Sequence, residues 1–438
     1  MNFDYKNILI MGYGKSGVAV EEIVKRLDVD YKIYDDGKGV TGGNYYCRLN
    51  KKIISQFDLI VVSPGISVYN KYVVMAERMG IKVVGELEFG YWFTSSPVIA
   101  ITGTNGKTTT TQMITSIVSS TYKCGAFGNI GKPLSLAYKE ENEFLICEVS
   151  SFQLETTNSF LPYISIILNV AEDHIDRHKT FENYIKCKIG LLKNCTDKSI
   201  VILNADDNII MSRTENIKAK KYYISKFNKV KGAYIYKEKI YVNLNGKSKE
   251  VMSLDEIPNF SGIIEDVLAS VLVGYLLKID GDKISECVKD FNISPHRLEL
   301  VANKNGVKFI NDSKSTNVHS SLNALRVTSG DIVLLLGGGD KNLNFDEIFQ
   351  KYKDKLKFVV AFGEARKKVL KCANKNKFEN IKVCKTFYDG VTFACQYAKE
   401  NDVVLLSPAC TSFDEFNSYK ERGEMFEKIV KEYDYVQN

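Results

Sequence analysis

A short glycine loop between an apolar run and a Lys-Thr pair constrains the fold of this chain most strongly. Val98–Ile101 leads into Gly103-Thr104-Asn105-Gly106-Lys107-Thr108-Thr109, which opens a segment able to form a helix. In a strand–loop–helix layout the glycines let backbone N–H groups point at phosphate oxygens. The lysine reaches the terminal phosphates, and the threonine hydroxyl contacts magnesium. The sequence therefore predicts an α/β domain with a mostly parallel sheet that binds ATP.

Length and composition are those of an ordinary globular enzyme. The 438 residues are too many for one core, and 45% are apolar and 26% charged. No run is long enough to span a membrane, and the ten cysteines form no Cys-x-x-Cys pair. The net charge of +6 comes from scattered lysines without a basic stripe, which argues against nucleic-acid binding. We expect a cytoplasmic protein with reduced thiols, no membrane span and small anionic substrates.

Apolar runs alternate with helical patterns along most of the chain, which predicts α/β units with mostly parallel sheets. We divide the chain into three domains, residues 1–93, 94–293 and 294–438. The lysine-rich stretch around 213–250 predicts hairpins with one turn at Asn243–Gly246, followed by a helix over Ile263–Leu277. The expected strands are Ile8–Met11, Tyr31–Tyr34, Leu59–Val62, Phe144–Cys147, Ile164–Leu168, Ser199–Leu203, Val307–Ile310, Ile332–Leu336, Phe358–Ala361 and Val403–Leu406.

A second glycine pattern, Gly12-Tyr13-Gly14-Lys15-Ser16-Gly17, follows the first expected strand and precedes Asp35 at the end of the next. By itself this pattern is typical of a dinucleotide-binding site, in which the acid binds a ribose hydroxyl. It would suit a nicotinamide-dependent oxidoreductase. Hydride transfer does not need a triphosphate loop, however. We therefore prefer a different nucleotide with a diphosphate link for this domain.

Charged residues follow two expected strands of the central domain. Glu148 ends an apolar strand, where a carboxylate would complete a magnesium site with Thr108, because buried acids are costly unless they are paired or bind metal. The segment Asn169–His178 holds two of the four histidines beside several acids. Lys188 lies on an expected helix, where a solvated surface lysine is the default interpretation.

Several longer motifs resemble the Mur ligases of peptidoglycan synthesis, and within them the branch that adds D-glutamate to UDP-N-acetylmuramoyl-L-alanine. The similarity covers essentially the whole chain. The motifs that carry it are Gly128–Gly131, Glu148–Glu155, Asn169 with Glu172-Asp173-His174 and Asp176, Pro295-His296-Arg297, Asn311–Asn317, Leu336–Lys341 and Ser407–Asp414.

The resemblance implies a three-domain ATP-dependent ligase that acts through an acyl phosphate in cytoplasmic precursor synthesis. It implies a Rossmann-like front domain for the UDP group, a central P-loop domain for ATP and a Rossmann-like third domain. Two magnesium ions are implied, with Lys188 carrying a carbamate. The expected substrates are UDP-N-acetylmuramoyl-L-alanine, D-glutamate and ATP, and the expected working state is a monomer.

The resemblance also assigns roles to residues of each domain. The front domain would hold the UDP group with Gly14, Lys15, Ser16, Gly17, Asp35, Ser63, Pro64 and Gly65. ATP would be bound by the loop 103–109 together with Arg297, Asp312 and Asp266. The metal ligands would be Thr108, Glu148, His174 and Lys188, with Lys107, Glu148, His174 and Lys188 as catalytic residues. The muramoyl-alanine path would be lined by Asn129, Ser150, Gln153 and His174. D-Glutamate would be held by Lys314, Thr316, Lys341, Ser412, Phe413 and Tyr419.

The segment Gly262–Asp266 departs from the family pattern His-Asn-x-x-Asn, whose asparagines help hold the adenine of ATP. Asp266 still offers an acceptor to an amine, whereas Ile263 cannot replace an amide, so we expect an altered nucleotide preference. A sister ligase for another amino acid, a folylpolyglutamate synthetase, an oxidoreductase and a non-catalytic UDP-sugar-binding protein are the alternatives. The sister ligase is the nearest of these, but Lys341 with neighbouring hydroxyls suits a small dicarboxylate, and the sequence has no Asp-Asn-Pro-Arg motif of the type that recognises diaminopimelate. Folylpolyglutamate synthetases lack a UDP-binding front domain. An oxidoreductase leaves Lys107, Glu148 and Lys188 unexplained, and a UDP-sugar-binding protein does not need a triphosphate loop.

Overall fold

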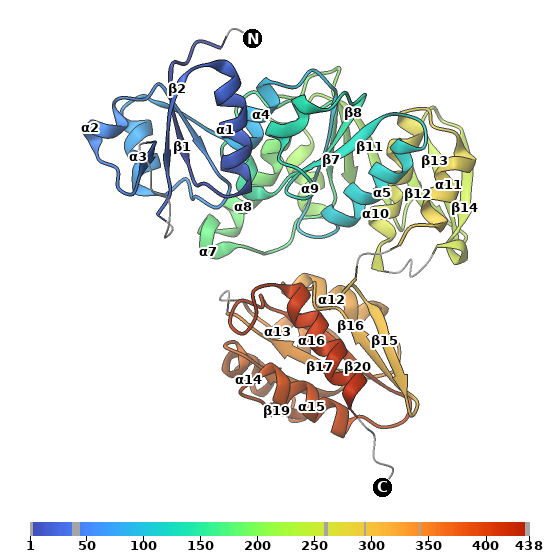
Figure 1. Cartoon of the computed structure of the whole chain (residues 1–438). Helices are drawn as coiled ribbons and strands as arrows, with labels where there is room; N and C mark the ends of the chain where they lie inside the picture. The colour runs from blue at the N-terminus through green and yellow to red at the C-terminus, as the bar shows by residue number, and fades with distance from the viewer. Residues whose placement is uncertain (1–2, 37–43, 258–261, 293–294, 341–342, 434–438) are drawn as a thin grey trace. The chain divides into compact units, whose positions relative to one another are not determined.

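The computed structural model describes residues 3–36, 44–257, 262–292, 295–340 and 343–433. The chain forms two compact units (Figure 1). Unit 1 comprises residues 1–170 and 182–291, and unit 2 comprises residues 171–181 and 292–438. In the part of the chain that is described, no helix is long and apolar enough to cross a membrane.

The first sheet of unit 1 is fully parallel and has the strand order β3-β2-β1-β4-β5. Its central strands β1 and β4 are almost entirely buried, as expected where helices cover both faces of a parallel sheet. The strands are β1 (Asn7–Met11), β2 (Asp30–Tyr34), β3 (Tyr45–Tyr46), β4 (Leu59–Val62) and β5 (Lys82–Gly85), and the helices are α1 (Lys15–Leu27), α2 (Lys51–Ile54), α3 (Lys71–Arg78) and α4 (Glu86–Trp92).

The second sheet of unit 1 has nine strands in the order β14-β13-β12-β11-β10-β9-β6-β8-β7. Strands β6 to β12 pair in parallel, and β12, β13 and β14 form the predicted antiparallel hairpins. The strands are β6 (Val98–Thr102), β7 (Cys124–Gly128), β8 (Phe144–Glu148), β9 (Ile164–Ile167), β10 (Ile200–Asn204), β11 (Lys220–Ser225), β12 (Gly232–Tyr236), β13 (Lys239–Asn243) and β14 (Ser248–Ser253). The helices are α5 (Lys107–Ser119), α6 (Ser151–Leu154), α8 (Phe181–Ile189), α9 (Asn208–Thr214), α10 (Ile264–Leu276) and α11 (Gly281–Lys289), with short 3₁₀ turns at Leu134–Lys139, Gly190–Leu192 and Leu254–Glu256.

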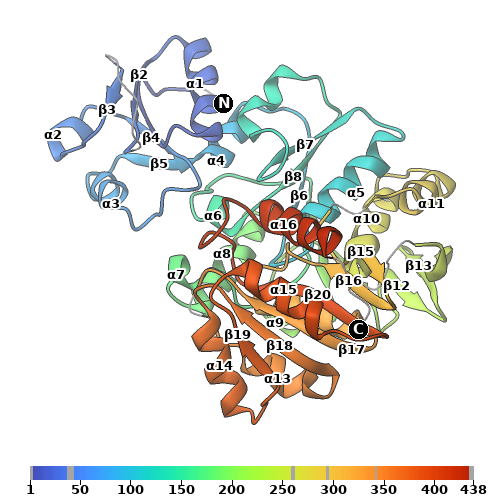
Figure 2. The ribbon, with the colours of Figure 1, turned by 60° about the horizontal axis from the view of Figure 1, so that its bottom comes forward.

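The sheet of unit 2 has the order β15-β16-β20-β17-β18-β19, and only the edge strand β15 is antiparallel. Its strands are β15 (Glu299–Lys304), β16 (Val307–Asn311), β17 (Asp331–Gly337), β18 (Leu356–Phe362), β19 (Ile381–Val383) and β20 (Asp402–Ala409). Its helices are α7 (Ile175–His178), α12 (Val318–Val327), α13 (Asp346–Tyr352), α14 (Arg366–Lys375), α15 (Phe387–Tyr397) and α16 (Tyr419–Glu432). Helices α15 and α16 lie side by side on this sheet (Figure 2).

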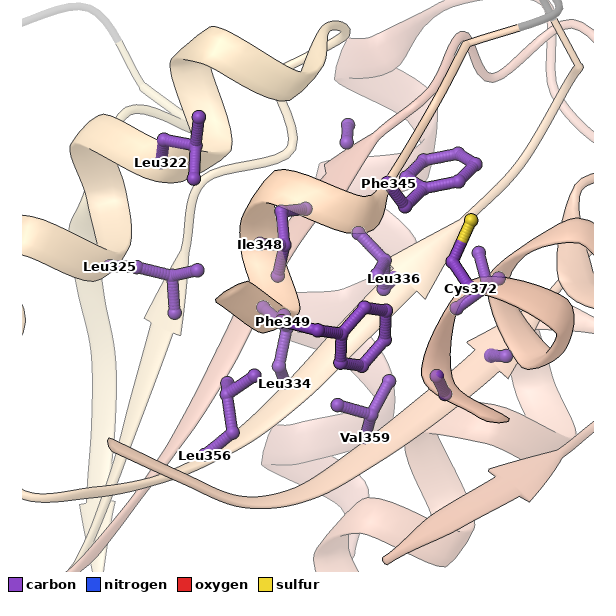
Figure 3. Packing of buried hydrophobic residues seen from close by; sticks show 14 of the residues in the cluster. Leu322, Leu325, Leu334, Leu336, Phe345, Ile348, Phe349, Leu356, Val359 and Cys372 are labelled. Carbon is purple, nitrogen blue, oxygen red and sulfur yellow. The ribbon is translucent and has the colours of Figure 1, made fainter. Parts of the chain in front are cut away.

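The period-two alternation of strand β17 divides the core of unit 2 into two layers. Leu334 and Leu336 pack toward helices α12, α13 and α14, where Phe349 fills the centre of the layer (Figure 3). Val333 and Leu335 point to the other face and pack with residues of α15 and α16. Both faces of the sheet are therefore covered, and the carboxyl ends of its strands are left for the loops.

The front and central sheets of unit 1 are joined by a buried carboxylate. Glu88 of helix α4 accepts backbone hydrogen bonds from Asn158 at 2.9 Å, Ser159 at 2.7 Å and Phe160 at 3.0 Å. Burial raises the pKa of Glu88, but these hydrogen bonds outweigh that effect and hold the pKa below its usual value. A charged Glu88 thus fastens the front sheet to the loop before strand β9.

Candidate active site

The phosphate loop lies between strand β6 and helix α5. Gly106 precedes the helix with φ of +85°, a conformation that favours glycine. The Lys107 ammonium donates to the carbonyl oxygens of Gly103 and Thr104, both at 2.9 Å. The Lys107 side chain therefore folds back onto its own loop, where it can reach the phosphates that such a loop binds.

Asn169 holds the other side of this loop. Its side chain accepts from the Asn105 N–H at 2.8 Å and donates to the Asn105 carbonyl at 3.2 Å, and its own carbonyl accepts from the Thr104 N–H at 2.9 Å. The sequence placed Asn169 in a motif but gave it no role. Its position directly after an apolar strand was the available signal, because strand ends meet the neighbouring loop in a parallel sheet.

Glu148 is the last residue of strand β8 and is 1% exposed. Its Oε1 atom accepts a 2.7 Å hydrogen bond from the Asn129 amide. Its Oε2 atom is buried without a hydrogen-bond partner among the described residues. A buried carboxylate oxygen of this kind is costly unless a cation or another donor meets it, so the site fits an oxygen-binding ion such as Mg²⁺.

Lys188 of helix α8 is not a surface lysine. Its side chain is 1% exposed and its Nζ atom donates to the carbonyl of Gly103 at 2.7 Å. The ammonium also lies 4.7 Å from the centre of the Tyr184 ring, and the Tyr184 hydroxyl is 3.0 Å from Thr104 Oγ1. The default interpretation is thus wrong, because the α8 face that bears Lys188 packs against the phosphate loop rather than facing water.

The segment that departs from the family pattern also reaches the phosphate loop. Asp266 is 3% exposed and accepts a 3.0 Å hydrogen bond from the Thr110 hydroxyl. A Cβ added to Gly106 would lie 2.1 Å from Asp266 Oδ1, so this carboxylate touches the loop backbone. Ile263 is buried at 3% exposure. A contact between Asp266 and the nucleotide base stays a prediction.

The front sheet brings its glycine turn, Asp35 and Ser63 together. The Tyr13 N–H donates to Asp35 Oδ2 at 2.6 Å, and the Ser63 hydroxyl donates to the Gly12 carbonyl at 2.8 Å. A Cβ on Gly17 would lie 2.1 Å from the Gly12 carbonyl oxygen, so only glycine fits there. Asp35 is thus already engaged by the turn, and its contact with a ribose stays a prediction.

Ser150 and Gln153 are bound to each other at the start of helix α6. The N–H and hydroxyl of Ser150 donate to Gln153 Oε1 at 2.9 and 3.0 Å, and Ser150 Oγ accepts from the Gln153 N–H at 3.3 Å. These contacts form a capping box that stabilises the first helical turn. Their expected substrate contacts remain untested.

Asp312 directly follows strand β16 in unit 2 and is 3% exposed. Its Oδ2 atom accepts from the Ser407 hydroxyl at 2.8 Å, and its Oδ1 atom accepts from the Leu298 N–H at 3.3 Å. Burial raises the pKa of Asp312 to about 6, because these bonds and the Arg297 charge offset the desolvation only in part. Asp312 therefore titrates close to neutral pH.

The acidic loop after strand β9 belongs to unit 2. Asp173 is 4% exposed, and its carboxylate accepts from the Asn317 amide at 3.0 Å and from the His174 N–H at 2.8 Å. Asn317 in turn caps helix α12 by accepting from the Ser320 N–H at 2.9 Å. The Asp173 carboxylate therefore connects the His174 backbone to the segment that carries Thr316.

Lys314, Ser412 and Phe413 lie in loops that follow strands β16 and β20, and Tyr419 is the first residue of helix α16. Lys314 is half-buried with its Nζ atom 5.9 Å from the centre of the Tyr419 ring, and Phe413 is 74% exposed. Ser412 is 2% exposed. Lys341 lies outside the described residues. Sequence reasoning missed Arg422, a buried arginine between these loops.

Models of three protein domains match successive parts of the chain. They are the Mur ligase MurD-like N-terminal domain over residues 6–85, the Mur ligase middle domain over residues 101–265 and the Mur ligase glutamate ligase domain over residues 296–410. A curated UDP-N-acetylmuramoylalanine–D-glutamate ligase of Thermoanaerobacter sp. (strain X514) is 37% identical over 452 residues, and the match covers 99% of each chain. The chain belongs to the Mur ligase family.

A second curated relative is also similar over nearly the full chain, and two solved structures share the fold. The ligase of the same name from Clostridioides difficile (strain 630) is 33% identical over 451 residues, covering 98% of this chain and 99% of its own. Among solved structures, a pseudomurein peptide ligase type C from Methanothermus fervidus is similar with a TM-score of 0.62 and 18% identity over 97% of this chain and 100% of its own. The structure of MurF ligase from Thermotoga maritima in complex with ADP is similar with a TM-score of 0.58 and 16% identity. The match covers 97% of this chain and 95% of that chain.

Membership of the Mur ligase family confirms the predicted fold class of three α/β domains with mostly parallel sheets. It also confirms an ATP-dependent ligase of peptidoglycan synthesis as the class of enzyme. Which nucleotide the glycine turn Gly12–Gly17 binds stays a prediction. The domain boundaries and the roles of individual site residues stay predictions.

Proposed function

We propose that this Mur ligase joins D-glutamate to UDP-N-acetylmuramoyl-L-alanine at the expense of ATP. The observation that carries the proposal is the match to curated UDP-N-acetylmuramoylalanine–D-glutamate ligases. These relatives are 33–37% identical to this chain, and the matches cover 98–99% of it. It is supported by the phosphate loop, around which lie Lys107, Lys188 and the Glu148 Oε2 atom, an oxygen with no hydrogen-bond partner among the described residues.

The reaction follows from the chemistry of the substrates. The carboxylate of the muramoyl-alanine attacks the γ-phosphorus of ATP, the bond to the bridging oxygen breaks, and ADP leaves with that oxygen. The acyl phosphate is then attacked by the amine of D-glutamate, which loses a proton as phosphate leaves and the amide forms. Lys107 stabilises the negative charge that spreads over the transferring phosphoryl group.

Magnesium ions supply Lewis-acid stabilisation of the phosphoryl oxygens when they are bound. We infer that Thr108 and Glu148 would hold one ion, and that His174 and a carbamate on Lys188 would hold a second. The fit rests on the buried Glu148 Oε2 atom, which lacks a protein partner among the described residues. A carbamate would turn Lys188 from a cation into an oxygen ligand.

The other substrates are assigned by motif. The front turn with Gly14, Lys15, Ser16, Gly17, Asp35, Ser63, Pro64 and Gly65 would hold the UDP group, and Asn129, Ser150 and Gln153 would line the path of the muramoyl-alanine. Arg297 and Asp312 would contact ATP. The amino acid would be held by Lys314, Thr316, Lys341, Ser412, Phe413 and Tyr419. These substrates are cytoplasmic, and one chain carries every assigned residue, so we infer a cytoplasmic monomer.

The proposal is tested by measuring ADP release while substrates are omitted one at a time. We expect release only when ATP, UDP-N-acetylmuramoyl-L-alanine and D-glutamate are all present, and a product heavier by one glutamyl residue in mass spectrometry. Lys107→Ala should be inactive while still binding the UDP substrate. Release with a diamino acid in place of D-glutamate would identify a sister ligase, and release without an amino acid would contradict the proposal.

A further inference from the structure

Glu86 is a buried carboxylate that the predicted mechanism does not use. It is the first residue of helix α4 and is 1% exposed. Its Oε1 atom accepts from the Ser135 N–H at 2.7 Å, and its backbone carbonyl accepts from the Ser135 hydroxyl at 3.4 Å. Its Oε2 atom is buried without a hydrogen-bond partner in the described part of the chain. Burial raises the pKa of Glu86, because the bonds to Ser135 offset the desolvation only in part.

Helix α4 also packs directly on the 3₁₀ turn to which Ser135 belongs. A Cβ on Gly90 would lie 2.5 Å from the Ser135 nitrogen and 2.7 Å from the Leu134 carbonyl carbon, so only glycine leaves room for the turn. Leu134 is 1% exposed at this contact. Residues four apart lie on the same side of a helix, so Glu86 and Gly90 hold the turn from one face of α4. Helix α4 therefore fixes where the 3₁₀ turn begins.

The loop that precedes this turn is closed on itself and carries Asn129. The Gly128 N–H donates to the Lys132 carbonyl at 2.8 Å, which closes the loop at the end of strand β7. Asn129 donates its N–H to the Glu148 carbonyl at 2.9 Å and its side-chain amide to Glu148 Oε1 at 2.7 Å. Pro133 joins the loop to the turn, and its ring restricts the backbone at the junction. A displacement of the turn would therefore reach Asn129 through a short and stiff connection.

Glu88, two residues further along the same helix, provides a comparison. Its carboxylate also binds backbone N–H groups of the central domain, but these belong to residues 158–160, where no substrate contact is predicted. Glu86 binds the segment that follows Asn129, a residue predicted to line the muramoyl-alanine path. The two carboxylates thus allow a contact that stabilises the protein to be separated from one that also shapes a substrate path.

We propose that Glu86 is a positioning residue for the muramoyl-alanine end of the UDP substrate. It holds the turn at Ser135 so that the loop before it presents Asn129 beside Glu148. It acts through this backbone and does not touch the substrate. The inference rests on the proposed function for the identity of that substrate.

The test compares Glu86→Ala and Glu86→Gln with Glu88→Gln, which weakens the neighbouring contact of the same helix. We expect Glu86→Ala to raise the KM for UDP-N-acetylmuramoyl-L-alanine about fivefold or more, because the Ser135 N–H loses its acceptor. The KM values for ATP and D-glutamate, and the inhibition constant of UDP alone, should stay within about twofold of wild type. Glu86→Gln keeps an oxygen for Ser135 and should have the KM of wild type. Glu88→Gln should lower the midpoint of urea denaturation without changing this KM.

The proposal is overturned if Glu86→Ala keeps the KM of wild type, or if Glu88→Gln or Glu86→Gln raises it as much as Glu86→Ala does. It is also overturned if the inhibition constant of UDP rises as much as the KM, because the front sheet itself would then be disturbed. If Glu86→Ala does not fold, as judged by circular dichroism, Glu86→Met takes its place, since methionine fills similar space without an oxygen acceptor. If that variant does not fold either, Glu86 is a structural residue and the proposal is wrong.

Failure of the proposed function is a separate result, because wild type and Glu88→Gln would then not use UDP-N-acetylmuramoyl-L-alanine. The same KM comparison would then be made with the UDP-linked substrate that wild type does use.

Discussion

Buried ionisable side chains surround the predicted ATP site, and each has a different partner. Lys188 binds a loop carbonyl, Glu148 leaves one oxygen unpartnered among the described residues, and Asp266 accepts from a threonine hydroxyl. Buried charges are costly without such compensation, so each of them has a consequence that a substitution can measure.

Lys188 should act as a carboxylate ligand and not as a cation. We expect Lys188→Ala to be nearly inactive, because the second metal position loses its ligand. Formate or acetate should restore part of the activity by filling the vacated position. Steady-state rates with and without each carboxylate are the measurement, and chloride at equal ionic strength is the control. Near-normal activity without added carboxylate would mean that Lys188 only packs against the loop.

Because its pKa is raised in the folded state, Asp312 should make the folded protein less stable as pH rises. Its pKa is raised from 3.8 to about 6 in the folded state, so the native protein holds this proton more tightly than the unfolded chain does. The resulting stabilisation is complete below pH 3.8, is lost as pH rises through about 6, and is worth at most about 3 kcal/mol. Asp312→Asn should lack this loss, so its stability relative to wild type should increase between pH 4 and 7 in urea titrations. A constant difference across that range would contradict the raised pKa.

Asp266→Asn should lower the KM for ATP several-fold. The substitution removes a negative charge that touches the phosphate loop at Gly106 and keeps an oxygen acceptor for the Thr110 hydroxyl. The nucleotide preference of the same variant, measured as the ratio of rates with ATP and GTP, reports on the altered segment 262–266. A higher KM for ATP in Asp266→Asn would show that the nucleotide needs the carboxylate itself.

At the scale of the elements, helix α4 should stabilise unit 1 mainly through Glu88, which binds the loop before strand β9. Glu88→Gln should destabilise unit 1 by about 2 kcal/mol, because three backbone N–H groups lose a charged acceptor. Because the pKa of Glu88 is lowered, its stabilisation is present above the usual carboxylate pKa and is lost as pH falls through the lower folded value. Urea denaturation at neutral pH is the measurement, with Glu77→Gln on the exposed face of α3 as control. Equal stability of the two variants would mean that other contacts join the sheets.

The sequence predicted those elements whose signals are local. The apolar strand before Gly103, the helix after Lys107 and the terminal position of Glu148 each follow from a few consecutive residues, and the structure contains them. The side chain of Lys188 could not be placed in this way, because its burial depends on which face of α8 packs against Gly103, 85 residues earlier in the chain. Arg422 was missed for a similar reason, since its partner Ser313 lies 109 residues earlier in the chain and follows a different strand from its partner Cys410.

At the scale of the whole molecule, the front and central sheets of unit 1 should respond together to a ligand of the front sheet. A ligand bound to the native state at 100 times its Kd slows exchange through global unfolding about 100-fold. We therefore expect the UDP substrate to protect slowly exchanging amides of strand β8 as strongly as those of β1. Hydrogen exchange followed by mass spectrometry is the measurement. Protection confined to β1 would show that the two sheets open independently.

The contact made by Glu88 also bears on dissecting the protein into its parts. A recombinant fragment that ends before strand β6 would keep Glu88 but would lose the Asn158, Ser159 and Phe160 N–H groups that bind its carboxylate. The isolated front sheet would therefore be less stable than the same residues in the whole chain, and its properties would not represent those of the sheet in the protein.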